Sequence, residues 1–322
     1  MRALQVTEFS TPPVFRDLPR PDPAAREVRV RVAACGLNYA DLLLIKGQYQ
    51  ETPEPPFTLG LEIAGVVDAL GEGVTGLSIG DRVMVYGGSG GLADYCIAPA
   101  SACLPIPDVM SFADAAGFQI AYGTSHLALV NRAAVRSGET LLVLGAAGGV
   151  GLTAVEIGAA LGARVIAVAR GADKCATAAA AGASETIDAT DPELLAKLKA
   201  AGGADVVYDP VGGALGETAL RACNRGARVL VIGFASGDHP QVKLNHMLVK
   251  NIAIHGFYWG GYLSLDPAAL RESLSDLLEM YEHGQIKPHI GLTAPLDAAP
   301  EALEKLRRRE TTGKVVITMA EG

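Results

Sequence analysis

One glycine-rich segment in the middle of the chain constrains the fold more than any other feature. Residues 140–151 read Thr-Leu-Leu-Val-Leu-Gly-Ala-Ala-Gly-Gly-Val-Gly, an apolar run followed by closely spaced glycines. Glycines between a strand and a helix let backbone N–H groups approach a pyrophosphate, whose charge the positive end of the helix dipole favours. The match to G-x-G-x-x-G is imperfect because Ala146 stands at the first glycine. A turn that merely packs a helix on a sheet is the alternative.

Strand-like and helix-like segments alternate from this point onward, which is typical of βαβ units in a parallel sheet. The expected strands are 141–144, 164–169, 204–208 and 227–232, together with a third strand that ends at Ile187, and 252–257 is the sixth strand of the sheet. The expected helices lie between them, at 149–161, 173–181, 191–201 and 215–223. This succession predicts a doubly wound parallel sheet, the α/β Rossmann architecture of dinucleotide-binding domains, at residues 122–261.

The first part of the chain has a different pattern. Its β-rich runs at 28–34, 64–70 and 82–86 are separated by Gly and Pro and show little helical periodicity, which predicts a mostly β domain. After Tyr262 an amphipathic helix precedes the strand-like run 314–318. Because the chain finishes in a strand, we expect it to return to the first domain, which would then comprise residues 1–121 and 262–322.

Composition excludes several classes of protein. The chain is 49% hydrophobic and 19% charged, so it can form a folded core, and its net charge of −8 would repel nucleic acid. We find neither the ~20 apolar residues of a membrane span nor the order of a signal peptide. We therefore expect a cytoplasmic protein without a nucleic-acid or membrane partner. Its five cysteines include no C-x-x-C pair, which argues against a disulfide framework or a cysteine-rich zinc site.

The end of the second strand bears on the choice of cofactor. An NAD enzyme usually places an acidic residue there to bind the ribose 2′-hydroxyl. Here Ala169 is followed by Arg170, and Lys174 lies four residues further on. Two cations suit a 2′-phosphate, so the sequence favours NADPH over NADH. Ordinary solvated surface charges are the alternative.

Four segments together resemble the medium-chain dehydrogenase/reductase superfamily, and within it the zinc-independent, zeta-crystallin-like NADPH:quinone oxidoreductase family. They are Cys-Gly-Leu-Asn-Tyr-Ala-Asp at 35–41, Gly-Leu-Glu-Ile-Ala-Gly-Val-Val at 60–67, Ala-Ala-Gly-Gly-Val-Gly at 146–151, and Thr-Gly-Lys-Val-Val at 312–316. The resemblance spans nearly the whole chain. It implies a GroES-like catalytic domain beside the Rossmann domain, and a homodimer in which the strand 252–257 pairs across the dimer axis.

The same resemblance bears on zinc. Zinc alcohol dehydrogenases of the superfamily carry Cys where this chain has Asn38 and His where it has Leu61, and leucine cannot bind a metal. The first histidine of the sequence is His126. We therefore predict no catalytic metal in the first domain, and we interpret Cys35 as a small buried hydrophobic residue rather than a nucleophile.

Without a metal, such a site can hold a nicotinamide against an electron-poor acceptor and donate hydrogen bonds to developing negative charge. The resemblance implies catalytic roles for Asn38, Asp41 and Tyr49 at the cleft between the domains. The residues expected to bind the cofactor are Asn38, Thr124, Ala146, Gly148, Gly149, Val150, Gly151, Arg170, Lys174, Val211, Gly233, Phe234, Phe257 and Lys314.

Several of these residues have a purely structural alternative: a turn for Asn38, the core for Tyr49, Phe234 and Phe257, a helix N-cap for Thr124, and a solvated charge for Lys314. Trp259 could line a pocket or an interface. One departure from the family concerns the third strand, where some relatives add an aromatic or basic residue to the 2′-phosphate pocket. Here Ile187 is followed by Asp188 and Ala189.

The hypothesis is a reductase that transfers a hydride from NADPH to a quinone or similar conjugated carbonyl without a metal. The enzymatic alternative is an enoyl reductase acting on an enoyl-CoA thioester or a small enone. The alternative of another class is a non-catalytic NADPH-binding protein with a structural or regulatory role.

Overall fold

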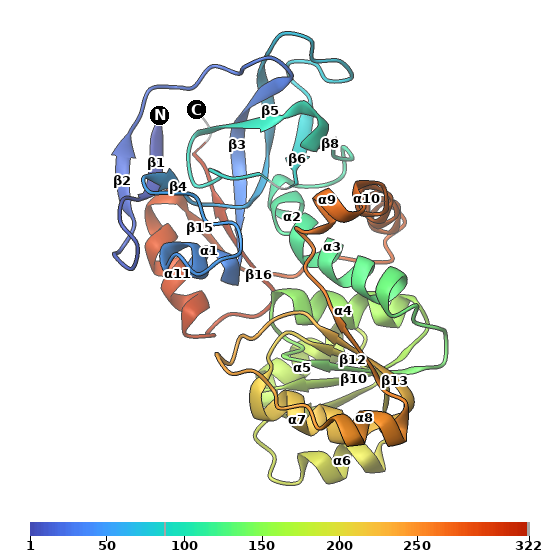
Figure 1. Cartoon of the computed structure of the whole chain (residues 1–322). Helices are drawn as coiled ribbons and strands as arrows, with labels where there is room; N and C mark the ends of the chain where they lie inside the picture. Colours follow the sequence, from blue (N-terminus) through green and yellow to red (C-terminus); the bar gives the residue numbers. More distant parts are fainter. Residues whose placement is uncertain (87, 321–322) are drawn as a thin grey trace. The chain divides into compact units, whose positions relative to one another are not determined.

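The computed structural model describes residues 1–86 and 88–320 of the chain (Figure 1). The chain forms two compact units. Unit 1 comprises Met1–Ile120 and Pro288–Gly322, so it is discontinuous, and unit 2 comprises Ala121–Lys287. In the part of the chain that the structure describes, we find no helix long and apolar enough to cross a bilayer.

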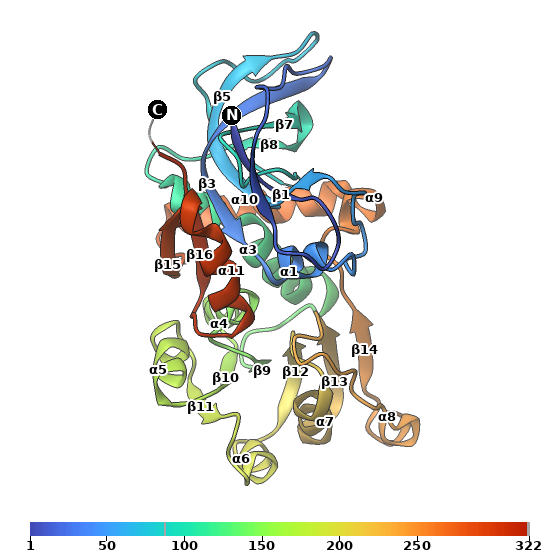
Figure 2. The same ribbon diagram turned by 90° about the vertical axis from the view of Figure 1, so that its left-hand side faces the viewer.

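Unit 2 is built on a six-stranded parallel sheet with the strand order β11-β10-β9-β12-β13-β14. Figure 2 labels these strands. The strands are β9 (Thr140–Leu144), β10 (Arg164–Ala169), β11 (Glu185–Asp188), β12 (Ala204–Asp209), β13 (Cys223–Val231) and β14 (Ala253–Gly256). The order reverses between β9 and β12, which is the topological switch point of a doubly wound sheet. The predicted fold class of this unit is confirmed.

Helices connect the strands of unit 2, and α3 enters the unit from the end of unit 1. They are α3 (Gln119–Leu127), α4 (Gly149–Ala160), α5 (Ala172–Ala180), α6 (Leu194–Ala200), α7 (Gly213–Ala222), α8 (Leu244–Lys250), α9 (Tyr262–Leu265) and α10 (Pro267–Glu282). A π-helical turn, Ala128–Arg132, follows α3.

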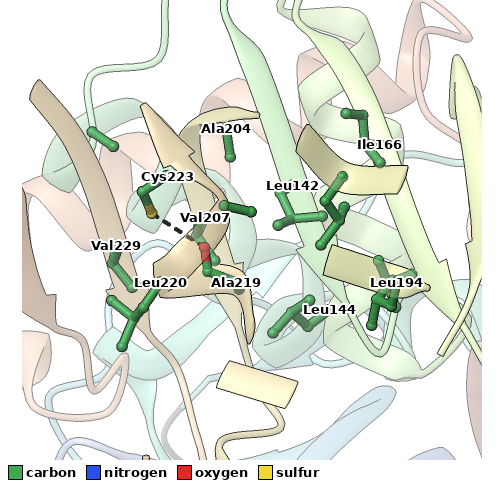
Figure 3. Packing of buried hydrophobic residues seen from close by; sticks show 14 of the residues in the cluster. Leu142, Leu144, Ile166, Leu194, Ala204, Val207, Ala219, Leu220, Cys223 and Val229 are labelled. Carbon is green, nitrogen blue, oxygen red and sulfur yellow. Dashed lines mark hydrogen bonds between the residues drawn. The ribbon is translucent and has the colours of Figure 1, made fainter. Parts of the chain in front are cut away.

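Alternate residues of the central strand β9 point to opposite faces of the sheet. Leu142 and Leu144 belong to a buried cluster with side chains of α6 and α7, such as Leu194 and Leu220 (Figure 3). On the other side, α4 approaches β9 so closely that a Cβ on its Gly158 would lie 2.4 Å from Leu141 Cδ2. Burial on both faces explains why the strand is an uninterrupted apolar run.

The chain returns to unit 1 at Pro288, whereas the sequence led us to expect the return near residue 262. The amphipathic helix α10 accounts for the difference because it belongs to unit 2. Its residues Leu270, Leu274 and Leu277 are completely buried, and Ser273 Oγ lies 2.9 Å from Nδ1 of His126 in α3. Its apolar face therefore completes the core of unit 2.

Unit 1 is mostly β, as predicted. Its strands are β1 (Arg2–Val6), β2 (Val14–Asp17), β3 (Glu27–Leu37), β4 (Phe57–Thr58), β5 (Glu62–Leu70), β6 (Arg82–Val85), β7 (Tyr95–Pro99), β8 (Cys103–Pro105), β15 (Ile290–Pro295) and β16 (Lys314–Thr318). Its helices are α1 (Tyr39–Ile45), α2 (Phe112–Ala116) and α11 (Ala299–Arg307), with 3-10 turns at Ala100–Ala102 and Leu296–Ala298. The larger sheet has the order β15-β16-β3-β5-β6-β8, with β7 also paired to β3, and the smaller one has the order β2-β1-β4.

The larger sheet brings three distant parts of the sequence together at the end of β3. Strand β16 pairs antiparallel with β3, with Val315 opposite Leu37, and β5 pairs with the other edge of β3, with Glu62 opposite Gly36. The first residues of β16 and β5 therefore lie on either side of the last residues of β3, directly before α1.

Candidate functional site

Asn38 is the residue between β3 and α1, and it caps the N-terminus of that helix. Its backbone N–H donates a hydrogen bond to Asp41 Oδ2 at 2.8 Å, and the backbone N–H of Gly60 donates to Asp41 Oδ1 at 3.2 Å. Asp41 thus ties the start of α1 to the turn before β5. Gly60 has a φ of +100°, and a Cβ there would lie 2.6 Å from Leu92 N, so this turn requires glycine.

Asp41 is completely buried. Burial raises the pKa of its carboxyl to about 6, against the lowering effects of the Asn38 N–H, of the Lys314 charge and of the Gly60 N–H. Both carboxylate oxygens accept backbone hydrogen bonds, which is the geometry of a group that fixes a loop. The catalytic role implied for Asp41 stays a prediction.

The buried ion pair of Glu62 and Lys314 contacts both ends of the Asn38 side-chain amide. Lys314 Nζ donates to Glu62 Oε2 at 2.7 Å, to Asn38 Oδ1 at 2.7 Å and to the backbone oxygen of Leu37 at 3.0 Å. Asn38 Nδ2 in turn donates to Glu62 Oε2 at 3.0 Å and to the backbone oxygen of Gly36 at 3.3 Å. Glu62 is completely buried and Lys314 is 4% exposed, whereas Asn38 is only partly buried.

Lys314 was expected to bind the cofactor, and the structure shows that its ammonium group is bound by acceptors of unit 1. Glu62 was not among the predicted site residues. Its second oxygen, Oε1, accepts a hydrogen bond from the backbone N–H of Ile120 at 2.8 Å. Two sequence signals could have found Glu62: it is a charged residue at the head of an apolar strand, and it lies in the family-like segment 60–67. Neither signal names its partner Lys314, which lies 252 residues away.

Three other residues that the sequence singled out lie in or against the core of unit 1. Leu61 and Tyr49 are partly buried and pack against one hydrophobic cluster, and Cys35 is completely buried within it. Burial raises the pKa of the Cys35 thiol, which agrees with its interpretation as a hydrophobic residue. Among the described residues, we find no group of three His, Cys, Asp or Glu side chains placed to hold a metal ion.

The glycine-rich turn of unit 2 joins β9 to α4. Gly145 has a φ of +58°, and Gly148 precedes the first residue of α4 in an extended conformation. A Cβ on Gly151 would lie 2.2 Å from the backbone oxygen of Gly145, so the helix can approach the turn only with glycine there. The buried Ala146 donates its N–H to Val168 O at 3.0 Å, which fixes the turn to β10.

The start of α4 is suited to an anion. Its first intrahelical hydrogen bond runs from Leu152 N to Gly148 O, so the N–H groups of Gly149, Val150 and Gly151 point out of the helix end. The first turn carries no acidic side chain. A backbone that can be approached closely, beside the positive end of a helix dipole, fits a pyrophosphate.

A buried cluster of hydroxyl groups supports this turn from below. Ser125 Oγ donates to the backbone oxygen of Val150 at 2.9 Å, and it lies 2.8 Å from Thr153 Oγ1 and 2.9 Å from the phenol oxygen of Tyr208. These contacts join α3 and β12 to the first turn of α4. Sequence reasoning missed the cluster because its members lie on three separate elements.

Thr124 was expected either at the cofactor or as a helix N-cap. The N-cap alternative is wrong, because α3 begins at Gln119 and Thr124 lies in its interior. Thr124 is 7% exposed, next to the buried Ser125. Its role in binding stays a prediction.

The loop after β12 lies against the glycine-rich turn. Asp209 Oδ1 accepts hydrogen bonds from the N–H groups of Val211 and Gly212, each at 2.8 Å. A Cβ on Gly145 would lie 2.9 Å from Val211 Cγ2, so the Val211 side chain contacts the turn directly. The structure thus brings Val211 beside the predicted pyrophosphate-binding residues.

The predicted aromatic contacts differ in exposure. Phe234 is 39% exposed, and its ring lies against that of His239 in a tilted arrangement with centroids 4.3 Å apart, while Phe257 is 7% exposed and packs on Tyr262. Phe234 therefore has a face open to a ligand, and Phe257 is mainly a core residue. A Cβ on Gly233 would lie 3.5 Å from Pro210 O, an ordinary contact, so the protein itself does not require glycine there.

Trp259, whose place the sequence left open, packs inside unit 2. A Cβ on Gly123 would lie 2.7 Å from its indole nitrogen, so Gly123 of α3 gives the indole its space. The side chain is 6% exposed and its indole N–H is buried without a hydrogen-bond partner among the described residues.

Arg170 lies between β10 and α5, and Lys174 lies in the first turn of α5. Arg170 is exposed and Lys174 is partly buried. The neighbouring Asp188, at the end of β11, accepts a hydrogen bond from Gly171 N at 3.1 Å. Its hydrogen bonds to Thr190 and Gly171, with a smaller effect of the Arg170 charge, lower the pKa of this carboxyl. An acidic group thus lies close to the predicted 2′-phosphate site.

The family comparisons agree with this division of the chain. Residues 24–108 match the alcohol dehydrogenase GroES-like domain, and residues 149–280 match the domain described as zinc-binding dehydrogenase. The first match lies within unit 1 and the second within unit 2. Such a pair of domains is that of an oxidoreductase.

Individual relatives of similar sequence or structure define the class of oxidoreductase more narrowly. A quinone oxidoreductase-like protein 2 homolog of Nematostella vectensis is 40% identical, over 98% of this chain and 88% of the relative. The quinone oxidoreductase of Thermus thermophilus, solved alone and with NADPH, has a TM-score of 0.88 and 34% identity over 99% of this chain and 100% of its own. The Escherichia coli quinone oxidoreductase complexed with NADPH has a TM-score of 0.92 and 28% identity over 99% of this chain and 100% of its own.

The chain belongs to the medium-chain dehydrogenase/reductase superfamily and, within it, to the quinone oxidoreductase family. The fold and the family expected from the sequence are confirmed, and the chain is an oxidoreductase of this superfamily.

Proposed function

We propose that this protein reduces a quinone or a similar conjugated carbonyl with a hydride from NADPH, without a metal ion. The observation that carries the proposal is the turn from Gly145 to Gly151, which leaves the first N–H groups of α4 without a partner inside the helix and lies beside Val211. Relatives that were solved with NADPH, at high structural similarity over nearly the whole chain, support the same cofactor.

In this proposal, the cofactor is held by residues of unit 2. The N–H groups of Gly149, Val150 and Gly151 bind the pyrophosphate, and Arg170 with Lys174 binds the 2′-phosphate. Val211 and the exposed face of Phe234 contact the rest of the dinucleotide. The remaining predicted contacts of this unit are Thr124, Ala146, Gly148, Gly233 and Phe257.

The bound nicotinamide supplies the hydride. A quinone or enone delocalises the negative charge that develops on reduction, so no metal is needed to stabilise it. The residues of this chain are then required only to hold the reactants in place and to exclude water. Asn38 is the polar side chain of the Glu62–Lys314 cluster that remains accessible, and Tyr49 is proposed to donate a hydrogen bond to the acceptor. Lys314 contributes to cofactor binding through Asn38, whose side-chain oxygen accepts a hydrogen bond from its ammonium group at 2.7 Å.

Independence from zinc rests on the chemistry of the side chains. Leu61 packs in the core at the position where zinc relatives carry a ligand, and Asn38 is engaged by the Lys314 ammonium group. A cation bonded at this position would repel a second cation. We expect protein purified without added metal to contain no stoichiometric zinc and to keep its activity in a chelator, and one zinc per chain would contradict this.

We also propose that the protein is a cytoplasmic homodimer. Strand β14 is one of the two edge strands of the parallel sheet, the other being β11, so its outer hydrogen-bonding groups can pair with a second copy. Apolar side chains nearby in the sequence are exposed as well, including Leu244 at 78%, Leu248 at 77% and Ile254 at 40%. A second copy of the chain would cover such side chains.

A substrate panel tests the reaction. NADPH consumption is measured with quinones, small enones and enoyl-CoA thioesters, with NADH in place of NADPH as the cofactor control. Turnover that is fastest with quinones supports the proposal, and turnover with enoyl thioesters alone would assign an enoyl reductase instead. Tight NADPH binding without oxidation by any acceptor would indicate a non-catalytic role.

A further inference from the structure

We propose that the buried Glu62–Lys314 pair fixes the amide of Asn38 so that this side chain offers a ligand one hydrogen-bond acceptor and no donor. Glu62 and Lys314 are then positioning residues that act through Asn38. The inference rests on the proposed function, because the ligand is the cofactor or the product of that reaction. The inference adds to the proposed function a statement of which hydrogen-bonding group the site offers its ligand.

The orientation of the amide follows from the chemistry of its two partners. An ammonium group can only donate hydrogen bonds and a carboxylate can only accept them. The oxygen of Asn38 must therefore face Lys314 Nζ, at 2.7 Å, and the nitrogen must face Glu62 Oε2, at 3.0 Å. A flipped amide would place two acceptors together and two donors together.

All side-chain N–H groups of Asn38 and Lys314 are engaged in hydrogen bonds within unit 1. Both N–H groups of Asn38 Nδ2 are engaged, by Glu62 Oε2 and by Gly36 O, and the three N–H groups of Lys314 go to Glu62, Asn38 and Leu37. The N–H of Asp41 at the start of α1 donates to the backbone oxygen of Asn38, at 3.0 Å, so Lys314 Nζ is the donor bound to Asn38 Oδ1 and one lone pair of this oxygen remains open to a ligand. Asn38 is thus unsuited to stabilise an oxyanion and is suited to bind a hydroxyl group.

Burial confines this role to Asn38. Glu62 is completely buried and Lys314 is 4% exposed, so neither charged group meets a ligand directly, while Asn38 is only partly buried. The hydroxyl can come from two sources within the proposed reaction, the ribose of the cofactor or the quinol product. Both offer the same O–H donor, and separate binding measurements distinguish them.

The test removes both charges at once. Losing one partner of a buried ion pair leaves an isolated charge and destabilises the fold, whereas replacing both by neutral groups of similar size is often nearly neutral. We therefore compare the wild type with the double variant Glu62→Gln/Lys314→Met. The amide at 62 can both donate and accept, and methionine does neither, so the Asn38 amide is no longer held in one orientation.

Three quantities are measured on each protein: the melting temperature, the Kd of NADPH by calorimetry, and the inhibition constant of the quinol. We expect the melting temperature to stay near that of the wild type and one of the two ligand constants to rise about tenfold, as for one lost hydrogen bond. A rise in the Kd of NADPH assigns the hydroxyl to the cofactor, and a rise for the quinol assigns it to the product. A stable double variant with both constants unchanged would overturn the proposal.

The Arg29–Asp68 pair provides a matched control. This pair also lies in unit 1, where it joins β3 to β5. Arg29 Nε lies 2.6 Å from Asp68 Oδ2, and the Arg29 side chain is 9% exposed. The variant Arg29→Met/Asp68→Asn should leave both ligand constants within about twofold of the wild type. An equal loss in this control would mean that any disturbed ion pair of unit 1 weakens binding, which would also overturn the proposal.

Asn38→Leu shows whether the pair acts through Asn38. This substitution removes the acceptor and should raise the same constant about tenfold, and adding it to the double variant should bring little further loss, because all three changes remove one interaction. If Asn38→Leu binds both ligands as the wild type does, the proposal is wrong, even where the double variant fails to fold. A wild-type protein that binds neither NADPH nor NADH would instead refute the proposed function.

Discussion

The side-chain oxygens of Ser125 and Tyr208 lie 2.9 Å apart in the interior of unit 2. Burial raises the pKa of the Tyr208 phenol, so it is protonated at neutral pH and acts as a fixed hydrogen-bonding group. Because Ser125 also binds the backbone oxygen of Val150, this contact supports the first turn of α4.

Replacing Tyr208 by phenylalanine removes this support. We expect the free energy of unfolding to fall by about 1–2 kcal/mol, since the Ser125 hydroxyl loses a buried partner. The Kd of NADPH should rise by about threefold because the turn is held less firmly. Tyr86→Phe is the control: its hydroxyl donates to Ser101 O at 2.9 Å in unit 1, so its loss should lower stability and leave the Kd unchanged. Equal Kd values for the two variants would contradict this account.

Gly151→Ala tests the glycine-rich turn. The added Cβ meets the backbone oxygen of Gly145 at 2.2 Å, so the turn or the helix must shift. We expect a loss of about 1–3 kcal/mol in stability and at least a tenfold rise in the Kd of NADPH. Gly256→Ala, where a Cβ meets nothing within 4 Å of the same chain, should leave the Kd of NADPH unchanged. Titration calorimetry and thermal unfolding measure both, and a Gly151→Ala variant with wild-type affinity would show that the turn does not bind the pyrophosphate.

Arg170→Ala/Lys174→Ala tests the choice of cofactor. If the two cations bind the 2′-phosphate, the Kd of NADPH should rise about 100-fold, and that of NADH by less than about threefold. Lys199→Ala, an exposed cation on α6, controls for a general loss of positive charge. Competition between 2′,5′-ADP and 5′-AMP gives the same comparison without the nicotinamide. A parallel loss of both dinucleotides would remove Arg170 and Lys174 from the 2′-phosphate site.

Asp41 predicts a pH dependence of stability. Its pKa is about 6 in the folded protein and near 3.8 when exposed, so the folded state holds its proton more tightly than the unfolded state. The resulting stabilisation is fully present below about pH 4 and is lost as the pH rises through about 6, by up to about 3 kcal/mol. Between pH 4 and 7, the wild type should therefore lose more stability than Asp41→Asn. Parallel stability curves for the two proteins, from chemical denaturation, would contradict the raised pKa.

The proposed homodimer can be tested at its edge strand. Ile254→Lys places a charge on β14, and we expect it to shift the protein toward the monomer in light scattering at micromolar concentration. Ile79→Lys, an exposed apolar residue of unit 1 with 67% exposure, is the matched control and should leave the mass unchanged. A wild-type protein that is monomeric under these conditions would refute the homodimer.

Much of unit 2 was predictable because its signals are local. The strand Thr140–Leu144 is buried on both faces and is therefore a continuous apolar run, and the turn that follows it needs glycine at Gly145 and Gly151 for steric reasons. Both signals occupy adjacent residues. The end of unit 2 was harder to place, because the apolar face of α10 looks the same whichever core it completes.

The pairs that organise the candidate site were not predictable in this way. Glu62 and Lys314 are 252 residues apart, and Ser125 and Tyr208 are 83 apart. Neither pair forms a local sequence pattern. A single charged or hydroxyl residue in an apolar segment does not reveal its partner, because the partner is known only when the arrangement of the strands is known. Lys314 illustrates the consequence: its position near the site was expected from the family, but its engagement with Glu62 and Asn38 became evident only in the fold.

The most direct test of the central claim is a single-turnover measurement. Protein stripped of metal by a chelator is mixed with NADPH and then with a quinone, and NADPH oxidation is followed against a sample with NADPH deuterated at the transferred hydrogen. We predict full oxidation of bound NADPH, slowed by the deuterium. No oxidation, or oxidation only after zinc is added, would contradict the account.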